Sequence, residues 1–511
     1  MARPEFVPHS DATSALAGDY DAVVLVAPSQ HCGHAPIDDA LHAAAALDAT
    51  VGDAVLLVPA RVPGGRLIFA PTGRLDRDWD DVRPFGDAAR AGVSRARDAG
   101  ATRPLVLLAG VPDSDAFDRA TEVALLGACA GLWEPLEARE HDPGCEPVTH
   151  LGFVGDSATA RLVGALEHGK RLSRDLGGTN PERMRPELFA EYCVNAFEGT
   201  PVQVEVKGNQ DALEREYPML MAVSRATRPV PRYHARVVRL VLEPEDEVTR
   251  TVLVAGKGVT YDTGGSDLKT GGHMAGMSRD KGGAASAAGL MRSLAELRPE
   301  GLRVVVELGL VRNAIGSEAF VTDEIITSHA GVRVRIGNTD AEGRLVLGDL
   351  LSHLREDALE AVEPRMFTVA TLTGHSLIAM GPYSIALDNG PARAEGVADG
   401  IDACGEAWGD CFEVSRLRRE DVAFVKPHSK ADDVLSCNNA PSSGTPRGHQ
   451  FPAAFLMKAS GLMEHGGDSD RPLAFTHVDI GGSYCEGMDW QHGRPTAAPV
   501  VALTAWAAGL G

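Results

Sequence analysis

The chain has 511 residues, 44% of them hydrophobic and 23% charged, which is typical of a soluble globular protein with two or three domains. Lys and Arg number 49 against 71 Asp and Glu, so the net charge of −22 disfavours nucleic acid and anionic membranes as partners. The eight cysteines form no CxxC pair, and neither an apolar signal core nor a run of about 18 apolar residues is present. We therefore expect a cytoplasmic protein with neither a zinc ribbon nor a nucleic-acid or membrane partner.

Residues 1–156 alternate apolar runs of strand length with longer amphipathic stretches. The runs that predict strands are Asp21–Pro28, Ala54–Ala60, Gly65–Pro71, Arg103–Gly110 and Leu151–Asp156. Between them, Asp80–Ala99 and Asp115–Leu132 have the spacing of helices. This alternation is typical of a small α/β domain with a parallel or mixed sheet. Nothing in these residues identifies a catalytic role.

One local cluster in this part of the chain, His31-Cys32-Gly33-His34, contains residue types that bind zinc. A structural zinc site needs four ligands, and no second pair lies nearby in the sequence to complete it. An ordinary loop is therefore the preferred interpretation, with a metal knuckle as the alternative.

The stretch from Ala158 to Leu176 carries leucine and alanine at helical spacing and ends at two glycines, with Pro181 soon after. Glycine just past a helix followed by proline is typical of a helix end. We therefore predict a linker helix at residues 157–178, between an N-terminal α/β domain at 1–156 and a catalytic domain at 179–511. An ordinary surface helix is the alternative.

The C-terminal part predicts a larger α/β domain in which helices flank a mixed central sheet. The stretch His234–Gly258 predicts a hairpin whose second strand carries Lys257. Further strands, rich in β-branched residues, are expected at Leu302–Val311, Arg365–Gly374 and Arg471–Gly482. Helices are expected at Pro186–Phe197, Gly282–Leu297 and Leu345–Arg355. The second of these helices consists mostly of small residues, which suits tight packing.

Four acidic residues lie in loops that follow apolar runs. They are Asp262 and Asp280 in the segment Gly256–Ala285, and Asp340 and Glu342 in the octapeptide NTDAEGRL at Asn338–Leu345. Ligands of an open α/β sheet gather just past the carboxyl ends of its strands. Four carboxylates that converge there repel one another unless cations lie among them, and two divalent ions balance four negative charges. The sequence therefore predicts a two-metal site, beside which Lys257 and Lys269 serve as neutral ligands or as charged electrophiles.

The octapeptide NTDAEGRL is the signature of the leucyl aminopeptidase (M17, cytosol aminopeptidase) family of metallopeptidases, and the chain resembles this family from about Asn180 to its C-terminus. The segments ADDVLSCNN, GHQFPAAFLM and FTHVDIGG extend the match. The sequence around the octapeptide looks more similar to the family branch called probable aminopeptidase-like than to the best-studied leucine aminopeptidases. The resemblance implies a variable N-terminal α/β domain and a C-terminal α/β domain that carries the active site.

The resemblance also assigns roles to the matching residues of this chain. The residues that would bind the two metals are Lys257, Asp262, Asp280, Asp340 and Glu342. Those that would line the substrate-binding site are Met277, Thr371, Leu372 and Gly374. Lys269 would be the catalytic lysine, and Arg344 would anchor a bicarbonate. Carboxylates suit Mn or Mg while a neutral amine favours Zn, so the expected ions are Zn or Mn, with Mg or Co as alternatives.

By the same resemblance, the enzyme is an exopeptidase that releases N-terminal amino acids, of leucine type and broad range. The metals would bind the free amine and the scissile carbonyl and lower the pKa of a bridging water from about 15.7 toward neutrality. The bicarbonate on Arg344 would accept the water proton, and Lys269 would stabilise the oxyanion. The family assembles as a hexamer, so a homohexamer is expected here.

Several alternatives stay open. Arg344 lies in the first turn of a helix, where the dipole disfavours a cation, so it either holds an anion or pairs with a neighbouring carboxylate. Met277 could instead fill the core. Ser278 and Lys281 depart from the Lys or Arg and the Met that are usual in the family, which puts metal affinity and substrate range in doubt. A zinc site built from His273, His375, His428 and His477 is disfavoured because the chain has no HExxH motif.

Two other functions remain as alternatives to a broad aminopeptidase. One is a narrow dipeptidase, such as one acting on Cys-Gly, which only a panel of substrates separates from the first. The other is a moonlighting or regulatory protein with weak peptidase activity, since some family members bind DNA. The intact ligand set, together with Lys269 and Arg344, argues against an inactive protein, and the charge of −22 argues against DNA.

Overall fold

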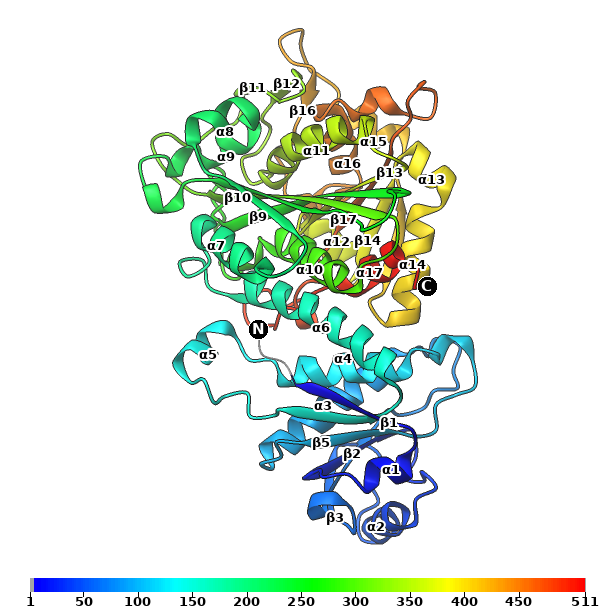
Figure 1. Cartoon of the computed structure of the whole chain (residues 1–511). Helices are drawn as coiled ribbons and strands as arrows, with labels where there is room; N and C mark the ends of the chain where they lie inside the picture. Colours follow the sequence, from blue (N-terminus) through cyan, green and yellow to red (C-terminus); the bar gives the residue numbers. More distant parts are fainter. Residues whose placement is uncertain (1–3, 511) are drawn as a thin grey trace. The chain divides into compact units, whose positions relative to one another are not determined.

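The computed structural model describes residues 4–510, and its helices and strands alternate as expected for an α/β protein (Figure 1). The chain forms two compact units. The first contains Met1–His168 and Cys404–Asp410, and the second contains Gly169–Ala403 and Cys411–Gly511. Helices α6 (Ser157–Gly178) and α14 (Val397–Trp408) each contribute residues to both units. The role of α6 as a linker between independent domains stays a prediction.

The first unit is built on a six-stranded sheet. In spatial order its strands are β1 (Glu5–His9), β6 (His150–Val154), β5 (Pro104–Leu108), β2 (Ala22–Ala27), β4 (Arg66–Pro71) and β3 (Leu56–Pro59). All neighbours run parallel except β3, which is antiparallel to β4. Its helices are α1 (Ala12–Leu16), α2 (Ala35–Ala45), α3 (Arg83–Asp98), α4 (Ala120–Leu132) and α5 (Leu136–His141). The mixed α/β character predicted for this part of the chain is confirmed.

Alternate side chains of the central strands face opposite layers of helices in this unit. Val24 of β2 packs against Gly92 of α3, whereas its neighbour Leu25 packs in the cluster that contains Leu41 of α2. The two-residue period of a strand therefore divides one apolar run between two helix layers. The expected helix at residues 115–132 begins later as α4, because Asp115–Phe117 form a separate 3-10 turn.

The second unit contains an eight-stranded mixed sheet. In spatial order its strands are β15 (Phe412–Arg416), β14 (Ser384–Asp388), β17 (Ala474–Asp479), β13 (Pro364–Ala370), β9 (Arg250–Asp262), β10 (Leu302–Asn313), β8 (Arg236–Leu242) and β7 (Gln203–Lys207). The four middle strands, β17, β13, β9 and β10, run parallel to one another. Their carboxyl ends therefore lie at one edge of the sheet, where ligands of open α/β sheets bind.

The hairpin predicted at residues 234–258 is wrong. Strands β8 and β9 form as expected, but β10 lies between them, antiparallel to β8 and parallel to β9. The connection from β9 through helix α10 (Gly282–Leu297) to β10 is a β-α-β crossover, which makes its two strands parallel. Nearly every side chain of β10 is buried, so this strand takes a central position and β8 pairs with its other edge.

Helices cover both faces of this sheet. Helices α10 and α17 (Val500–Ala508) lie on one face, and α11 (Gly343–Leu359), α9 (Pro218–Ser224) and α16 (Phe451–Ala459) lie on the other (Figure 1). The remaining helices of the unit are α7 (Pro186–Phe197), α8 (Gln210–Glu216), α12 (Gly374–Met380), α13 (Gly390–Glu395) and α15 (Arg419–Phe424). A small three-stranded sheet consists of β11 (Ile325–Thr327), β12 (Arg333–Arg335) and β16 (Val434–Leu435).

Small residues bring α10 unusually close to the sheet, as the sequence suggested. A Cβ atom added to Gly256 of β9 would lie 2.8 Å from the Cα atom of Ala284 in α10. A Cβ atom on Gly283 would collide with the carbonyl oxygen of Val369 in β13. The first turn of α10 is thereby held directly against the parallel strands.

All eight cysteines are free thiols. No helix within residues 4–510 is both long enough and apolar enough to cross a membrane.

Candidate metal centre

A cavity of about 570 Å³ opens at the carboxyl ends of β9 and β13. All but one of the residues predicted for the site line it. These are Lys257, Asp262, Lys269, Met277, Asp280, Asp340, Glu342, Thr371, Leu372 and Gly374. The exception is Arg344. Residues far apart in the sequence thus converge on one cavity, but only Asp262 lies at the end of a strand of the main sheet, since Asp280 follows a 3-10 turn and Asp340 and Glu342 follow β12 of the small sheet.

Three of the acidic side chains are brought together by three different elements. Asp262 is the last residue of β9, Asp280 directly follows the 3-10 turn Met277–Arg279 before α10, and Glu342 is the N-cap of α11. Ligand atoms of these three residues all lie within 4.8 Å of one another, and all three residues are buried. Buried carboxylates at this spacing repel one another strongly unless positive charge lies among them.

The backbone turn after β9 fixes one oxygen of Asp262. The amide of Gly264, which has a φ of +87°, donates to Oδ1 of Asp262 at 2.8 Å. The side-chain amide of Asn313, at the end of β10, donates to the same oxygen at 2.8 Å. The other oxygen, Oδ2, is directed to Lys269, at 2.9 Å from its Nζ. A residue at the glycine position must adopt a left-handed conformation, which explains why the turn is glycine-rich.

The carboxylates fit a metal centre because two of their oxygens have no protein partner. Oδ2 of Asp280 and Oε2 of Glu342 are buried and receive no hydrogen bond within residues 4–510. An unpaired buried carboxylate oxygen is costly, whereas a divalent cation satisfies several such oxygens at once. The donor set, carboxylates with a lysine, suits hard or borderline divalent ions.

Lys257 lies at the centre of the acidic cluster. Its Nζ is 2.7 Å from Oδ1 of Asp280 and 3.0 Å from Oε1 of Glu342, and it donates to the carbonyl oxygen of Thr371 at 2.8 Å. Burial opposes the charged form, but the charges of Asp280 and Glu342 outweigh burial and raise the pKa of Lys257. Burial and the neighbouring carboxylates in turn raise the pKa of Asp280 in spite of the attraction of Lys257. Lys257 could serve as a metal ligand only after it has lost a proton.

Lys269 and Asp340 form the outer side of the site. Nζ of Lys269 pairs with Asp262 and with Oδ1 of Asp340. Burial again opposes the ammonium, and the charges of Asp262 and Asp340 raise the pKa of Lys269 nevertheless. Burial, together with the negative charge of Asp262, raises the pKa of Asp340 to about 7. The two carboxylates therefore favour the ammonium form of Lys269, which is the form that an electrophile requires.

Arg344 lies in the first turn of α11, as expected, but outside the lining of the cavity. Its Nη1 donates to the carbonyl oxygen of Ser436 at 2.9 Å, and its guanidinium carbon is 4.9 Å from the centre of the Phe451 ring. Burial lowers the pKa of Arg344. Its partners among residues 4–510 are this carbonyl oxygen and this ring, neither of them a carboxylate, so the salt-bridge alternative is not supported. Nε is buried without a partner and remains a donor for an anion.

The two positions that depart from the family pattern lie beside Asp280. Lys281 is fully buried, and its Nζ donates to the carbonyl oxygen of Thr179 at 2.8 Å and to that of Ser278. It does not line the cavity. The extra lysine therefore donates to backbone carbonyls and does not reach the cavity.

The predicted histidine alternatives are not brought together. Within residues 4–510, only two groups of three or more His, Cys, Asp or Glu side chains are close enough to share an ion, and neither contains His31, His34, His273, His375, His428 or His477. His273 lines the cavity alone, and His375 pairs with His449 at 2.8 Å between their Nδ1 atoms. Burial lowers the pKa of His477 to about 3, so it is a neutral base.

Several cavity residues were missed from the sequence. Trp490, Leu377 and Asn439 line the cavity together with Ser442. Asn439 ends the matching segment ADDVLSCNN, which is a signal that could have identified it. Trp490 has no such signal, because it reaches the cavity from a loop near the C-terminus.

Comparison with known proteins gives a consistent result. The sequence profile of the "Cytosol aminopeptidase family, catalytic domain" matches residues 171–504. A Caenorhabditis elegans protein named "Putative aminopeptidase" is 43% identical over 87% of this chain and 85% of its own length. A "Probable cytosol aminopeptidase" of Synechococcus is 29% identical over 91% of this chain and 89% of its own length. The solved structure "Bottromycin maturation enzyme BotP in complex with Mn" has a TM-score of 0.76 at 23% identity, over 96% of this chain and 99% of that chain, which shows a shared fold.

Proposed function

Because the chain belongs to the cytosol aminopeptidase (M17) family and is therefore a hydrolase of the metallopeptidase class, we propose that it releases N-terminal amino acids from peptides at the cavity described above. The observation that carries the proposal is the buried cluster of Asp262, Asp280 and Glu342, two of which have unpartnered oxygens. Lys257 and Lys269 supply two positive charges against the four carboxylates of the site, and divalent ions would supply the rest.

We propose that two divalent ions are held by Lys257, Asp262, Asp280, Asp340 and Glu342. Zn and Mn are the preferred ions, with Mg or Co as alternatives, because the donors are mainly carboxylates with one amine. The solved structure of BotP is a complex with Mn, which supports a divalent ion of this kind. When bound, the ions supply Lewis acidity to the scissile carbonyl and make water acidic enough to lose a proton near neutral pH.

The side chains of this protein would then position and stabilise the reacting groups. Lys269 is held by Asp262 and Asp340 on the open side of the cluster, where its ammonium can stabilise a developing oxyanion. Met277, Leu372 and the neighbouring Leu377 provide an apolar surface for the first side chain of a peptide. This lining fits a leucine-type preference of broad range.

We further propose that Arg344 binds a bicarbonate, which would supply the proton acceptor. The buried, unpartnered Nε of Arg344 supports an anion at this side chain. Nη1 is already used by the carbonyl of Ser436, so the anion would use the remaining donors of the guanidinium.

Removal of divalent ions is expected to abolish hydrolysis of leucine anilide, and addition of Zn²⁺ or Mn²⁺ should restore it. The reason is that no side chain that lines the cavity is a Lewis acid that could replace a divalent ion. The measurement is the initial rate of the EDTA-treated, dialysed protein after addition of Zn²⁺, Mn²⁺, Co²⁺ or Mg²⁺, with aminoacyl anilides and Cys-Gly as substrates. Full activity of protein that elemental analysis shows to be metal-free would contradict the proposal. Hydrolysis of Cys-Gly alone would replace a broad aminopeptidase by a narrow dipeptidase.

We also propose a cytoplasmic homohexamer, on the basis of family membership. Light scattering is expected to give about six times the chain mass of 53.8 kDa. A stable monomer over the concentration range of the activity assay would exclude the hexamer without affecting the proposed chemistry.

A further inference from the structure

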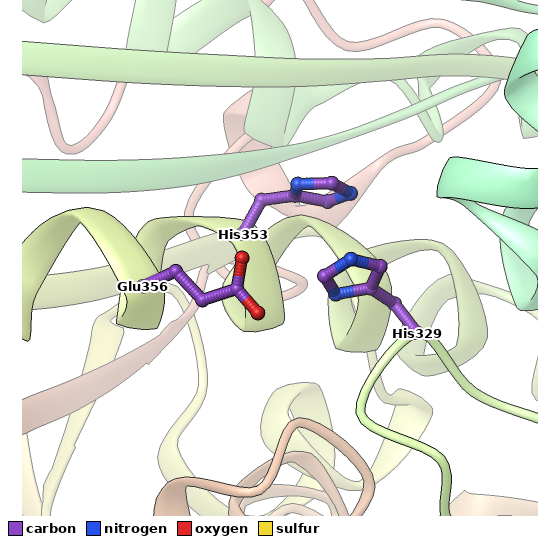
Figure 2. A group of neighbouring side chains, drawn as sticks. All are labelled: His329, His353 and Glu356. Carbon is purple, nitrogen blue, oxygen red and sulfur yellow. The ribbon is translucent and has the colours of Figure 1, made fainter.

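A second group of metal-binding side chains lies on α11, away from the acidic cluster. His353 and Glu356 are one helical turn apart on this helix, and His329 lies in the turn between β11 and β12. One ligand atom from each of the three residues lies within 4.8 Å of the others. Figure 2 shows the three side chains directed toward one another from the helix and the turn. His353 is eleven residues beyond Glu342, or about 16 Å along the helix, so this group is separate from the cavity.

Hydrogen bonds use one nitrogen of each imidazole and leave the other for a ligand. Nε2 of His353 donates to the carbonyl oxygen of Glu216 at 2.8 Å, which leaves the lone pair on Nδ1. Nδ1 of His329 lies 2.9 Å from Oγ of Ser352. In the tautomer in which Nδ1–H donates a hydrogen bond to this hydroxyl, Nε2 carries the lone pair. Metal-binding histidines commonly have their second nitrogen fixed in this way by a carbonyl or hydroxyl group.

The turn that carries His329 is also held in place. The backbone amide of His329 donates to Oδ1 of Asp349, a buried carboxylate on α11, at 2.9 Å. The rings of His329 and His353 are stacked, with their centres 3.9 Å apart and their planes inclined by 22°. The ring of Tyr217 covers the His353 ring, with a distance of 4.3 Å between centres. The position of both rings is therefore set by surrounding groups.

The charge and exposure of the group also fit a metal. Burial lowers the pKa of both histidines, and for His329 the neighbouring His353 lowers it further. Both imidazoles are therefore neutral bases at pH 7, the form that binds metals. Glu356 is exposed, and one of its oxygens, Oε1, accepts a hydrogen bond from Arg355 at 3.3 Å. Its carboxylate can supply an anionic ligand and leaves a path for an ion from solvent.

We propose that His329, His353 and Glu356 form a second metal site, for a borderline divalent ion of the Zn²⁺, Ni²⁺ or Cu²⁺ type. Two imidazoles and one carboxylate are the ligands that such ions prefer, and water would complete the coordination. The acidic cluster, by contrast, is built mainly from oxygen ligands. A metal at the second site would join the turn between β11 and β12 to α11 and so restrain the helix whose N-cap is Glu342. The proposal does not depend on the peptidase reaction.

The test is the stoichiometry of Zn²⁺ binding to the metal-stripped chain of 511 residues. Glu356→Gln, His329→Gln and His353→Phe are each expected to bind one Zn²⁺ fewer per chain than the wild type and to lose part of the rise in melting temperature caused by Zn²⁺. The phenylalanine preserves the ring that packs on Tyr217. Glu360→Gln, an exposed carboxylate at the end of the same helix, and His428→Ala, an exposed histidine, are the matched controls and should bind as the wild type does.

Pulsed EPR of the Cu²⁺-loaded protein gives a second, independent measurement. Modulation from the remote nitrogen of imidazole is expected in the wild type and in Glu342→Gln, because the ligands proposed for the acidic cluster include no histidine. It should be lost in His329→Gln and His353→Phe. Ser352→Ala, which removes the partner of the His329 ring, should weaken Zn²⁺ binding about ten- to a hundredfold. Equal Zn²⁺ stoichiometry in the wild type and in Glu356→Gln, or the absence of imidazole modulation from the wild type, would overturn the proposal.

Discussion

Replacement of Glu342 by glutamine, or of Asp340 by asparagine, is expected to abolish peptide hydrolysis. Loss of a residue that only contacts a metal ligand lowers activity by up to roughly 100-fold, and the loss of a ligand itself should be larger. Glu342 is 1% exposed and lies 3.0 Å from Nζ of Lys257. The amide removes one negative charge from the cluster and replaces an acceptor oxygen by a donor. Divalent ions should therefore bind far more weakly. The measurements are kcat/KM on leucine anilide and the metal content of the purified protein.

The fold should survive these substitutions, because the volume of the side chain hardly changes. Circular dichroism and the melting temperature of the metal-free proteins provide the check. Glu318→Gln is the matched control and should behave as the wild type does, because Glu318 is an exposed carboxylate in the loop between β10 and β11. A Glu342→Gln or Asp340→Asn enzyme with near-normal activity and normal metal content would show that the ligand assignment is wrong.

Lys269→Met is expected to lower kcat by roughly 100-fold or more with little change in KM, as when an oxyanion donor is removed. The ammonium of Lys269 is held by Asp262 and Asp340 beside the cluster. Metal content should be unchanged. Loss of bound metal would instead place Lys269 among the ligands. Lys458→Met, which alters an exposed lysine on α16, should have no effect.

Arg344→Ala is expected to cause a smaller loss than Lys269→Met, because water or added anions can partly replace a bicarbonate. In bicarbonate-free buffer, the wild type should become faster when bicarbonate is restored, and the Arg344 variant should respond much less. The substitution also removes a buried contact with Phe451, so the rates are compared below the melting temperature of the variant. Equal bicarbonate activation of both enzymes would reject the proposed anchor.

The sequence was most informative where function depends on local segments. Asp262 follows a long apolar run, and this pattern alone predicts its place at a strand end, whereas Asp280 directly follows a 3-10 turn before the small-residue helix. The predicted hairpin was wrong because β10, which comes about forty residues after β9 in the sequence, lies between β8 and β9 in the sheet. The second histidine group gave no signal, since His329 and His353 belong to different elements and have no motif spacing. Arg344 was placed correctly in its helix, but its burial behind the cavity depends on the packing of Phe451, which no local pattern reveals.

The close contacts between α10 and the sheet limit which residues the centre of the fold can accept over evolutionary time. Any side chain at Gly256 or Gly283 would push the helix away from β9 and β13, and Asp280, just before that helix, would move with it. Glycines that never touch a substrate should therefore be as intolerant of substitution as the carboxylates. A saturation mutagenesis scan of this chain would mark both sets equally, and only paired assays of protein abundance and turnover would separate the scaffold from the reactive groups.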